Sequence, residues 1–307
     1  MTTDADNGAV SFRNPQYIVD TDWLEEHLDD SGITVLDVTA KLTAELRNNA
    51  RADLYNPGHI PGSLFFDVAS ADGELSDRHA ALPWMWPSAD QFGETMAHYG
   101  IDNDTRVVLV ARTPRAGIDS GTMWCTRAWW TMHHMGVDVA ILRGGIEKWI
   151  AEDRPMTADE VAAEPATFTV RTGWERARAD QLAVLAALDD PSTCVVDSLP
   201  ASSFDGTDPG YGPRRGHITG AVNVSYSDLI ESETAGFLPA VEMKAVLDSA
   251  HLLDEQRIIT YCGGAIAATV DAFAMALFGH DDVAVYDGSL MEWSANPALP
   301  MVDPTNV

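Results

Sequence analysis

The stretch Gly58-His59-Ile60-Pro61-Gly62-Ser63-Leu64 has a counterpart in the second half of the chain, Gly216-His217-Ile218-Thr219-Gly220-Ala221-Val222. About twenty residues before each stretch stands an apolar run that ends in aspartate, Val35-Leu36-Asp37 in the first half and Val195-Val196-Asp197 in the second. Similar stretches at matched positions indicate an internal repeat, and a repeat must be recognised before any fold is assigned. The pattern predicts a chain of two related halves.

Three further pairs of matching segments follow in the same order: residues 106–111 and 257–262, residues 139–142 and 283–286, and residues 144–149 and 288–293. Four ordered pairs predict a tandem duplication. The short runs rich in β-branched residues predict buried parallel strands, and the longer segments between them, such as residues 123–135 and 267–278, predict helices. Strands that alternate with helices predict an α/β fold, in which each copy is a mainly parallel sheet flanked by helices.

The predicted organisation is a tail, two domains and a linker. A chain of 307 residues exceeds the usual size of a single core and suits two domains. A polar stretch that contains alanine, glutamate and proline separates the copies and is typical of a linker. The predicted boundaries are residues 1–16 for the tail, 17–150 for the first copy, 151–172 for the linker and 173–307 for the second copy.

The chain is strongly acidic. Its formal charge is -28, from 47 acidic and 19 basic side chains, which opposes binding to nucleic acid or to an anionic membrane surface. This composition fits a salty habitat as well as the base composition of a genome, and the sequence leaves both open. No apolar run of about 18 residues could span a bilayer, and the first six residues lack the basic and apolar parts of a signal peptide. We expect a cytoplasmic protein without nucleic-acid or membrane partners.

Most candidate metal ligands and acids have a structural explanation. The three cysteines are too few and too scattered for a disulfide framework or a four-ligand zinc site. His59 and His217 each stand alone in the repeated segment, which favours a structural role over a metal site. Asp37 and Asp197, at predicted strand ends, are expected to cap the loops that follow rather than act as catalytic acids.

The two copies differ at Cys262, whose counterpart is the inert Ala111. Cys262 follows an apolar strand and precedes small residues that lead into an apolar helix. The N–H groups of such a loop and the helix dipole stabilise an anion, and a helix N-terminus lowers a cysteine pKa below its ordinary value of about 8.5. We predict that Cys262 is a nucleophile. Its thiolate or persulfide would be held by Gly263, Gly264, Ala265, Ile266 and Ala267.

Two other interpretations of Cys262 are weaker. A cysteine phosphatase needs an arginine six positions after the cysteine to hold the phosphoryl oxygens, and that position is Ala268. An inert buried cysteine would not need the glycines that follow it. Cys125 and Cys194 are expected to be packing residues, although the sequence leaves open a role as a second, resolving thiol.

Together these features resemble the rhodanese family of thiosulfate and 3-mercaptopyruvate sulfurtransferases, over about residues 17–299. The tandem copies, the Gly-His-Ile segments, the lone cysteine after the fourth strand of the second copy and the Gly-x-x-x-x-Trp endings carry the resemblance. It implies two tandem rhodanese-like domains, the first catalytically silent, with the active site at the domain interface. The neutral residues 263–264 imply 3-mercaptopyruvate rather than thiosulfate as donor, but Ala265, Ala267 and Ala268 depart from the glycine or hydroxyl residues of the family.

The resemblance also implies arginines that hold the carboxylate of the donor, before the second Gly-His-Ile segment. Ser203 stands where the first of them is expected. Arg214 and Arg215, just before that segment, are the alternative, because a guanidinium matches a carboxylate bidentately. Arg78 and His79 resemble an interface segment that faces the active-site cysteine. The sequence leaves open whether these four side chains are instead solvated at the surface.

The expected reaction is a ping-pong transfer. The Cys262 thiolate attacks the outer sulfur of a small-molecule donor and forms a persulfide, from which cyanide, a thiol or a thioredoxin-like protein takes the sulfur. The loop N–H groups stabilise both anions, so no general base is required. No metal or organic cofactor is implied. Two alternatives stay open: a sulfur-relay module that delivers its persulfide to one protein partner with little turnover, and a regulatory copy whose Cys262 reacts like an ordinary thiol.

Overall fold

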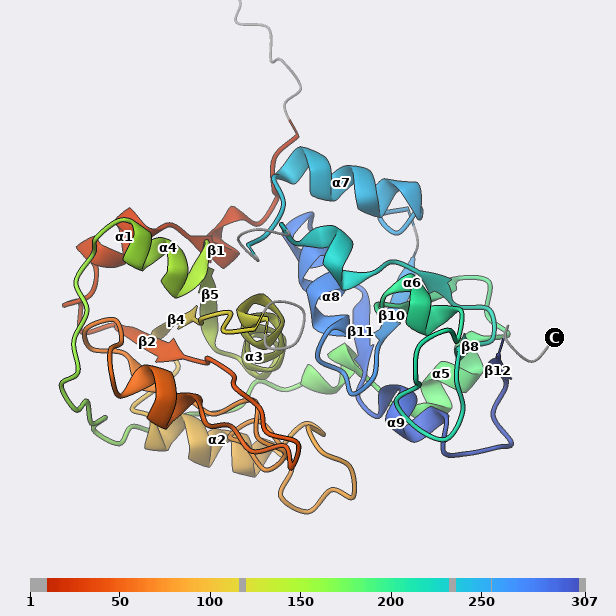
Figure 1. Ribbon diagram of the computed structural model, residues 1–307, viewed down its shortest axis with the longest axis horizontal. Helices are drawn as coiled ribbons and strands as arrows, with labels where there is room; N and C mark the ends of the chain where they lie inside the picture. Colours follow the sequence, from red (N-terminus) through yellow and green to blue (C-terminus); the bar gives the residue numbers. More distant parts are fainter. Residues whose placement is uncertain (1–9, 116–119, 232–235, 255, 304–307) are drawn as a thin grey trace, which may run out of the picture.

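The structure is a computed structural model that describes residues 10–115, 120–231, 236–254 and 256–303 of the chain. Its first half, red to yellow-green in Figure 1, alternates short strands with helices. In chain order the elements are η1 (Pro15–Tyr17), β1 (Ile18–Val19), α1 (Thr21–Glu26), β2 (Ile33–Asp37), η2 (Arg51–Tyr55), β3 (Leu64–Phe65), α2 (Ala89–His98), β4 (Arg106–Val110), α3 (Gly121–Met135), β5 (Asp138–Leu142) and α4 (Gly145–Ala151).

The second half, green to blue in Figure 1, repeats this alternation. Its elements are η3 (Trp174–Ala177), β6 (Arg178–Ala179), α5 (Gln181–Ala187), β7 (Thr193–Asp197), α6 (Ala201–Phe204), β8 (His217–Ile218), β9 (Val222–Asn223), η4 (Tyr226–Leu229), α7 (Ala240–Ser249), β10 (Arg257–Tyr261), α8 (Ala268–Leu277), β11 (Val283–Tyr286), α9 (Ser289–Trp293) and β12 (Met301–Val302).

Each half forms one five-stranded sheet, and these two sheets have the same topology, while β8 and β12 of the second half pair antiparallel in a separate two-stranded sheet. The strand orders of the five-stranded sheets are β1-β5-β4-β2-β3 and β6-β11-β10-β7-β9, with every pair parallel. The central strands β4 and β10 are buried at four of their five residues, as expected for parallel strands covered on both faces. The predicted duplication and α/β fold are therefore confirmed.

Helices α3 and α8 pack against each other and join the two domains (Figure 1). Of the 15 residues of α3, 12 are buried, because its own sheet covers one side and α8 the other. The rings of Trp129 and Phe273 meet edge to face with their centroids 4.7 Å apart, and the hydroxyls of Thr126 and Thr269 lie 2.9 Å apart. One hydrophobic core consequently extends through both domains.

The segments outside the two sheets also contact the domains. Before the first domain begins, Arg13 N donates to Leu277 O at 2.8 Å, and the rings of Phe12 and Phe278 lie 5.3 Å apart. The end of the predicted tail is thus attached to the second domain. Residues 152–173 between the domains form no named helix or strand. Among the described residues, no helix is both long enough and apolar enough to cross a membrane.

The histidines and aspartates of the repeats make structural contacts, as predicted. His59 and His217 each contact a main-chain carbonyl through Nδ1, at 2.9 and 2.7 Å, and each stacks on the ring of the residue that supplies the carbonyl. Asp37 and Asp197 each accept the N–H of the residue two positions later, at 3.0 and 2.9 Å. The repeated motifs therefore fix the turns and loops around the strand ends.

Candidate active site

Cys262 lies at the carboxyl end of β10, the central strand of the second sheet, and residues 263–267 connect it to α8. Ligands of open parallel sheets bind at this edge, outside the carboxyl ends of the strands. Cys262 is only 2% exposed. The side chains around the loop therefore cover it.

The hydroxyl of Ser289 fixes the loop that follows Cys262. It accepts hydrogen bonds from the N–H groups of Cys262 and Ala265, at 3.3 and 3.0 Å, and donates one to Tyr286 O at 2.8 Å. Ala265 has a φ of 60°, in the left-handed region that residues other than glycine rarely adopt. The bond to Ser289 thus holds the loop at its strained residue.

The start of α9 braces the other side of the loop. The N–H groups of Leu290 and Met291 donate to the carbonyls of Cys262 and Gly263, both at 3.0 Å. Sequence reasoning identifies this segment as a repeat but does not single out Ser289. The available signal is that a serine follows the glycine of the Gly-x-x-x-x-Trp segment in the second copy, where the first copy has another glycine.

The pKa of the Cys262 thiol is shifted in the direction opposite to the predicted one. Burial raises the pKa of the Cys262 thiol, the N–H groups of Ala268, Gly264 and Ile266 lower it, and the charge of Asp197 raises it. The prediction of a lowered pKa is wrong, because burial removes more solvation from the thiolate than three N–H groups replace. Of the predicted loop, the N–H groups of Gly264 and Ile266 act on the thiol, and with that of Ala268, one residue beyond the predicted loop, they form an N–H cradle for the sulfur.

Aromatic and apolar side chains cover the loop. A Cβ atom on Gly263 would overlap the ring of Tyr211, and one on Gly264 would lie 3.1 Å from Trp84 and 3.4 Å from Met291 Sδ. The two glycines are therefore required by close packing. Trp84 belongs to the first domain, so the loop of Cys262 lies at the domain interface.

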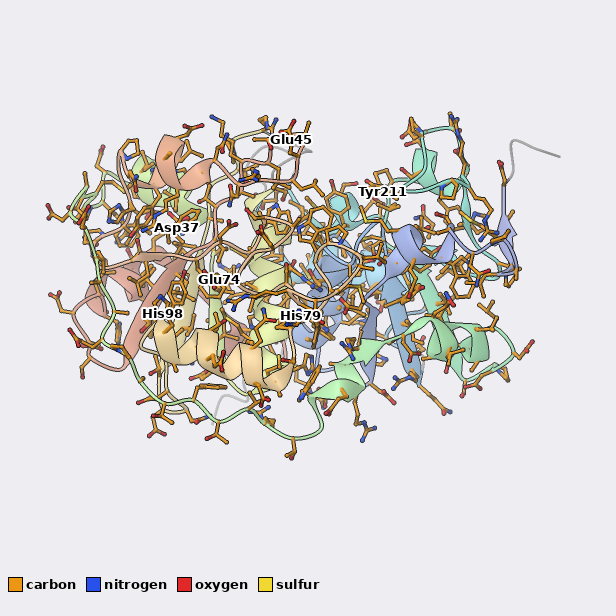
Figure 2. All side chains as sticks on the ribbon, turned by 90° about the horizontal axis from the view of Figure 1, so that it is seen from below. Asp37, Glu45, Glu74, His79, His98 and Tyr211 are labelled. Atoms are coloured by element: carbon orange, nitrogen blue, oxygen red, sulfur yellow. The ribbon has the colours of Figure 1, made fainter. Side chains whose placement is uncertain are left out.

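Two tyrosines lie close enough to Cys262 for its charge to act on them. Burial raises the pKa of Tyr211 to about 12, with the Cys262 thiolate as the second cause, and the same two causes raise the pKa of Tyr226. Tyr211 is 43% exposed, and Figure 2 shows it on the second domain. It separates the active-site loop from solvent.

A buried arginine of the first domain also reaches the loop. Arg127 of α3 donates to Ala265 O at 3.4 Å and to Trp84 O, and its guanidinium lies 3.7 Å from the carboxylate of Asp287. Sequence reasoning does not find Arg127, because it stands among aromatic residues of a helix whose pattern indicates only packing. Its partners come from distant parts of the chain.

The two arginines predicted to bind the donor have different surroundings. Arg214 donates to four main-chain carbonyls at 2.7 to 2.9 Å, those of Trp293, Ser294, Asn296 and Leu299. Its guanidinium therefore fastens the segment after α9 and has one N–H left. Arg215 is exposed and makes no hydrogen bond or ion pair within the part of the chain that the structure describes. Ser203 lies in α6.

Arg78 and His79 are exposed, and Figure 2 shows His79 on the first domain. The N–H of His79 donates to Asp77 at 2.8 Å, and neither side chain makes a hydrogen bond or ion pair among the described residues. The same segment reaches the loop of Cys262 through Trp84 instead. The interface contact implied by the family resemblance is thus made by a tryptophan a few residues further on.

The other two cysteines belong to the packing of the sheets. Cys125 is 3% exposed in α3, and burial raises the pKa of its thiol well above the ordinary value, followed by the charges of Asp37 and Glu147. Cys194 lies inside β7, and it packs against the core from a partly buried position. Both positions fit the predicted packing roles.

Residues 20–152 and 180–296 each match the family model described as the rhodanese-like domain. The chain belongs to the rhodanese family. Its two parallel sheets are accordingly two rhodanese domains in tandem, and the lone loop cysteine belongs to the second. The crystal structure of SseA from Escherichia coli, a 3-mercaptopyruvate sulfotransferase, is similar with a TM-score of 0.75 and 30% identity, covering 89% of this chain and 98% of that one.

The names of similar curated proteins refer to two different sulfur donors and to a sulfur carrier. The 3-mercaptopyruvate sulfurtransferase of Escherichia coli K12 is 31% identical over 290 residues, covering 93% of this chain and 97% of the relative. The thiosulfate sulfurtransferase of Mus musculus is 31% identical over 284 residues, covering 90% and 91%. The sulfur carrier protein TtuD of Thermus thermophilus is 28% identical over 304 residues, covering 95% and 98%.

Proposed function

We propose that this tandem rhodanese is a sulfurtransferase that carries a sulfane sulfur as a persulfide on Cys262. The observation that carries the proposal is the place of this thiol at the end of β10, where three main-chain N–H groups favour its anionic form. Relatives named for sulfur transfer match the chain over 90% or more of its length. Because Ala111 leaves the first domain without an equivalent thiol, we assign the chemistry to the second.

The reaction proceeds by two displacements at sulfur. The Cys262 thiolate attacks the outer sulfur of the donor, whose bond to the rest of the donor breaks, and the donor leaves with the electron pair as pyruvate enolate or as sulfite. Cyanide or an acceptor thiolate then attacks the outer sulfur of the persulfide, and Cys262 leaves as a thiolate. The N–H groups of Gly264, Ile266 and Ala268 stabilise the anion before and after each displacement.

Of the two donors, we propose 3-mercaptopyruvate. Residues 263–268 carry no cationic side chain, whereas thiosulfate brings two negative charges to the loop. With Arg214 occupied by main-chain carbonyls, Arg215 is the predicted arginine left to bind the carboxylate of the donor. The relatives named for the two donors are equally similar to the chain, so the neutral loop is the observation that favours one of them.

Sulfur relay to a protein partner is a second candidate function. It is favoured by the 2% exposure of Cys262 behind Tyr211 and by the similarity to a sulfur carrier protein. A relay module would carry one extra sulfur atom after isolation and would turn over small donors slowly. A thiol or a thioredoxin-like protein would then serve as its acceptor.

The test measures sulfur transfer from 3-mercaptopyruvate and from thiosulfate, to cyanide and to a thiol. The proposal expects transfer by the wild-type protein and by the Cys125→Ser and Cys194→Ser controls, none by Cys262→Ser, and 3-mercaptopyruvate as the better donor. Transfer by Cys262→Ser at the wild-type rate contradicts the proposal. An isolated protein that carries a persulfide but turns over neither donor favours the relay.

A further inference from the structure

Arg127 of the first domain lies between the active-site loop and a buried carboxylate of the second. Its Nη1 donates to Ala265 O at 3.4 Å and its Nη2 to Trp84 O, and the guanidinium carbon lies 5.9 Å from the centre of the Trp86 ring. The Asp287 carboxylate lies 3.7 Å away, and both side chains are 2% exposed. A planar guanidinium suits this place because its N–H groups point in several fixed directions at once.

Asp287 is held from both domains. Its Oδ2 accepts the N–H of Trp86 at 2.8 Å and lies 3.9 Å from Arg178, whereas its Oδ1 has no hydrogen bond among the described residues and faces Arg127. The positive charge of Arg127 is thus shared between Asp287 and the loop, and a change in Asp287 alters how much of it acts on the loop.

Ala265 is the point at which this contact affects the cradle. Its φ of 60° is strained, and its two main-chain groups are held from opposite sides, the N–H by Ser289 and the carbonyl by Arg127. The neighbouring N–H groups of Gly264 and Ile266 are two of the three that act on the Cys262 thiol. The orientation of those N–H groups depends on the conformation that the two contacts impose on Ala265.

We propose that Arg127 is a positioning residue through which the first domain controls the reactivity of Cys262 in the second. The proposal rests on the proposed function, since it concerns the same thiol. Arg127 holds the Ala265 peptide so that the neighbouring N–H groups face the sulfur, and its charge favours the thiolate. The first domain is therefore silent in its own loop but contributes to the chemistry of the other.

The charged and titratable groups around Cys262 act in opposite directions. Asp197 of β7 disfavours the thiolate, as ionised Tyr211, Tyr226 and Tyr261 would. Burial lowers the pKa of Arg127, but Asp287 and then the Cys262 thiolate oppose that change. Because the last interaction is mutual, Arg127 favours the thiolate.

The experiment follows the rate of Cys262 alkylation by iodoacetamide against pH, in a protein that also carries Cys125→Ser and Cys194→Ser. The midpoint of this pH dependence reports the ionisation of Cys262. Removing the guanidinium in Arg127→Met is expected to move that midpoint to higher pH by about one unit, so that alkylation at neutral pH falls about tenfold. Arg127→Lys should lie between this variant and the parent. Asp287→Asn should move the midpoint to lower pH, because it removes the charge that opposes Arg127.

The midpoint is expected to shift in opposite directions in Arg127→Met and Asp287→Asn. These opposite shifts distinguish the proposed role from a loss of packing, which cannot move the midpoint in both directions. Arg143→Met is the control, since Arg143 pairs with Asp20 at the surface of the same domain, at 2.8 Å, and its removal should leave the midpoint unchanged. If Arg127→Met does not fold, Arg127→Lys and Asp287→Asn still decide. Unchanged midpoints in these variants, or shifts of the same sign, overturn the proposal. Failure of the proposed function would appear separately, as sulfur transfer by Cys262→Ser.

Discussion

The loop after β4 and the loop after β10 occupy equivalent places in the two domains but satisfy their main-chain groups differently. After β4, the N–H of Thr113 donates to the carboxylate of Glu147 at 2.7 Å, so that a side chain of α4 supplies the negative charge. After β10, Met291 stands at the place of Glu147, and the N–H groups act on the thiol of Cys262. In the second loop, the anion held by the main-chain N–H groups is therefore the thiolate of Cys262 instead of a carboxylate.

In both loops, a main-chain N–H at the start of the following helix donates to the carbonyl of the residue that begins the loop. Ile146 N donates to Ala111 O at 3.0 Å, as Leu290 N does to Cys262 O. The two copies thus share the scaffold of the loop, while three replacements in the second copy distinguish its chemistry: a cysteine for an alanine, a serine for a glycine, and a methionine for a glutamate. A thiol alone is not expected to make the first loop active.

Moving the thiol between the loops should have the largest effect. Cys262→Ser is expected to abolish sulfur transfer, and adding Ala111→Cys to that variant should restore none. The reason is that the Glu147 carboxylate already occupies an N–H of the first loop and would repel a thiolate beside it. The measurement is sulfur transfer by the single and double variants. Recovery of transfer in the double variant would show that the two loops are equivalent after all.

Converting Ser289 into the glycine of the first copy should have a smaller effect. Ser289→Gly leaves the N–H groups of Cys262 and Ala265 without their acceptor, at about 1–3 kcal/mol for each unpaired buried group. We expect sulfur transfer to fall about 10- to 100-fold, with a lower melting temperature. Ser249→Ala, which removes an exposed hydroxyl at the end of α7, is the matched control. Wild-type transfer by Ser289→Gly would mean that the loop keeps its shape without this brace.

The pH dependence should show the smallest effect. Because the pKa of Cys262 is raised, mainly by burial, the thiol is mostly protonated at neutral pH, and the thiolate fraction rises as pH increases toward that pKa. Persulfide formation should therefore accelerate by up to about tenfold per pH unit above neutrality. Stopped-flow or quenched assays of persulfide formation would measure this slope. A rate that is constant or falls from neutral to alkaline pH contradicts a raised pKa.

Much of the fold could be predicted from the sequence, because a duplication presents each structural feature twice. The helix predicted at residues 123–135 is observed from Gly121 to Met135, and the one predicted at 267–278 from Ala268 to Leu277. Buried parallel strands leave continuous apolar runs that stand out in any sequence. The predicted domain boundaries rest on the same repeats, and the family model matches residues 20–152 and 180–296, the first match ending two residues beyond the predicted first copy.

The site was predictable only in part. The cysteine and its loop are contiguous in sequence, so their chemistry could be inferred from neighbours alone. Ser289 and Arg127 act on that loop from distant segments. The local signal for Ser289 is the serine that replaces the glycine of the first copy, whereas Arg127 stands among aromatic residues that indicate packing. The partners of Arg214 are carbonyls, which every residue carries, so no sequence pattern reveals that its guanidinium is occupied. The net direction of the Cys262 pKa depends on burial, which follows from the packing of both domains.

The central claim is that Cys262, and no group of the first loop, carries the transferred sulfur. It is tested most directly by incubating the protein with 3-mercaptopyruvate in the absence of an acceptor, and locating added sulfur by mass spectrometry of the intact chain and its peptides. The account predicts one extra sulfur atom on the peptide that contains Cys262, lost when cyanide is added and absent from Cys262→Ser. Extra sulfur on Cys125 or Cys194, or an equal gain in Cys262→Ser, would contradict it.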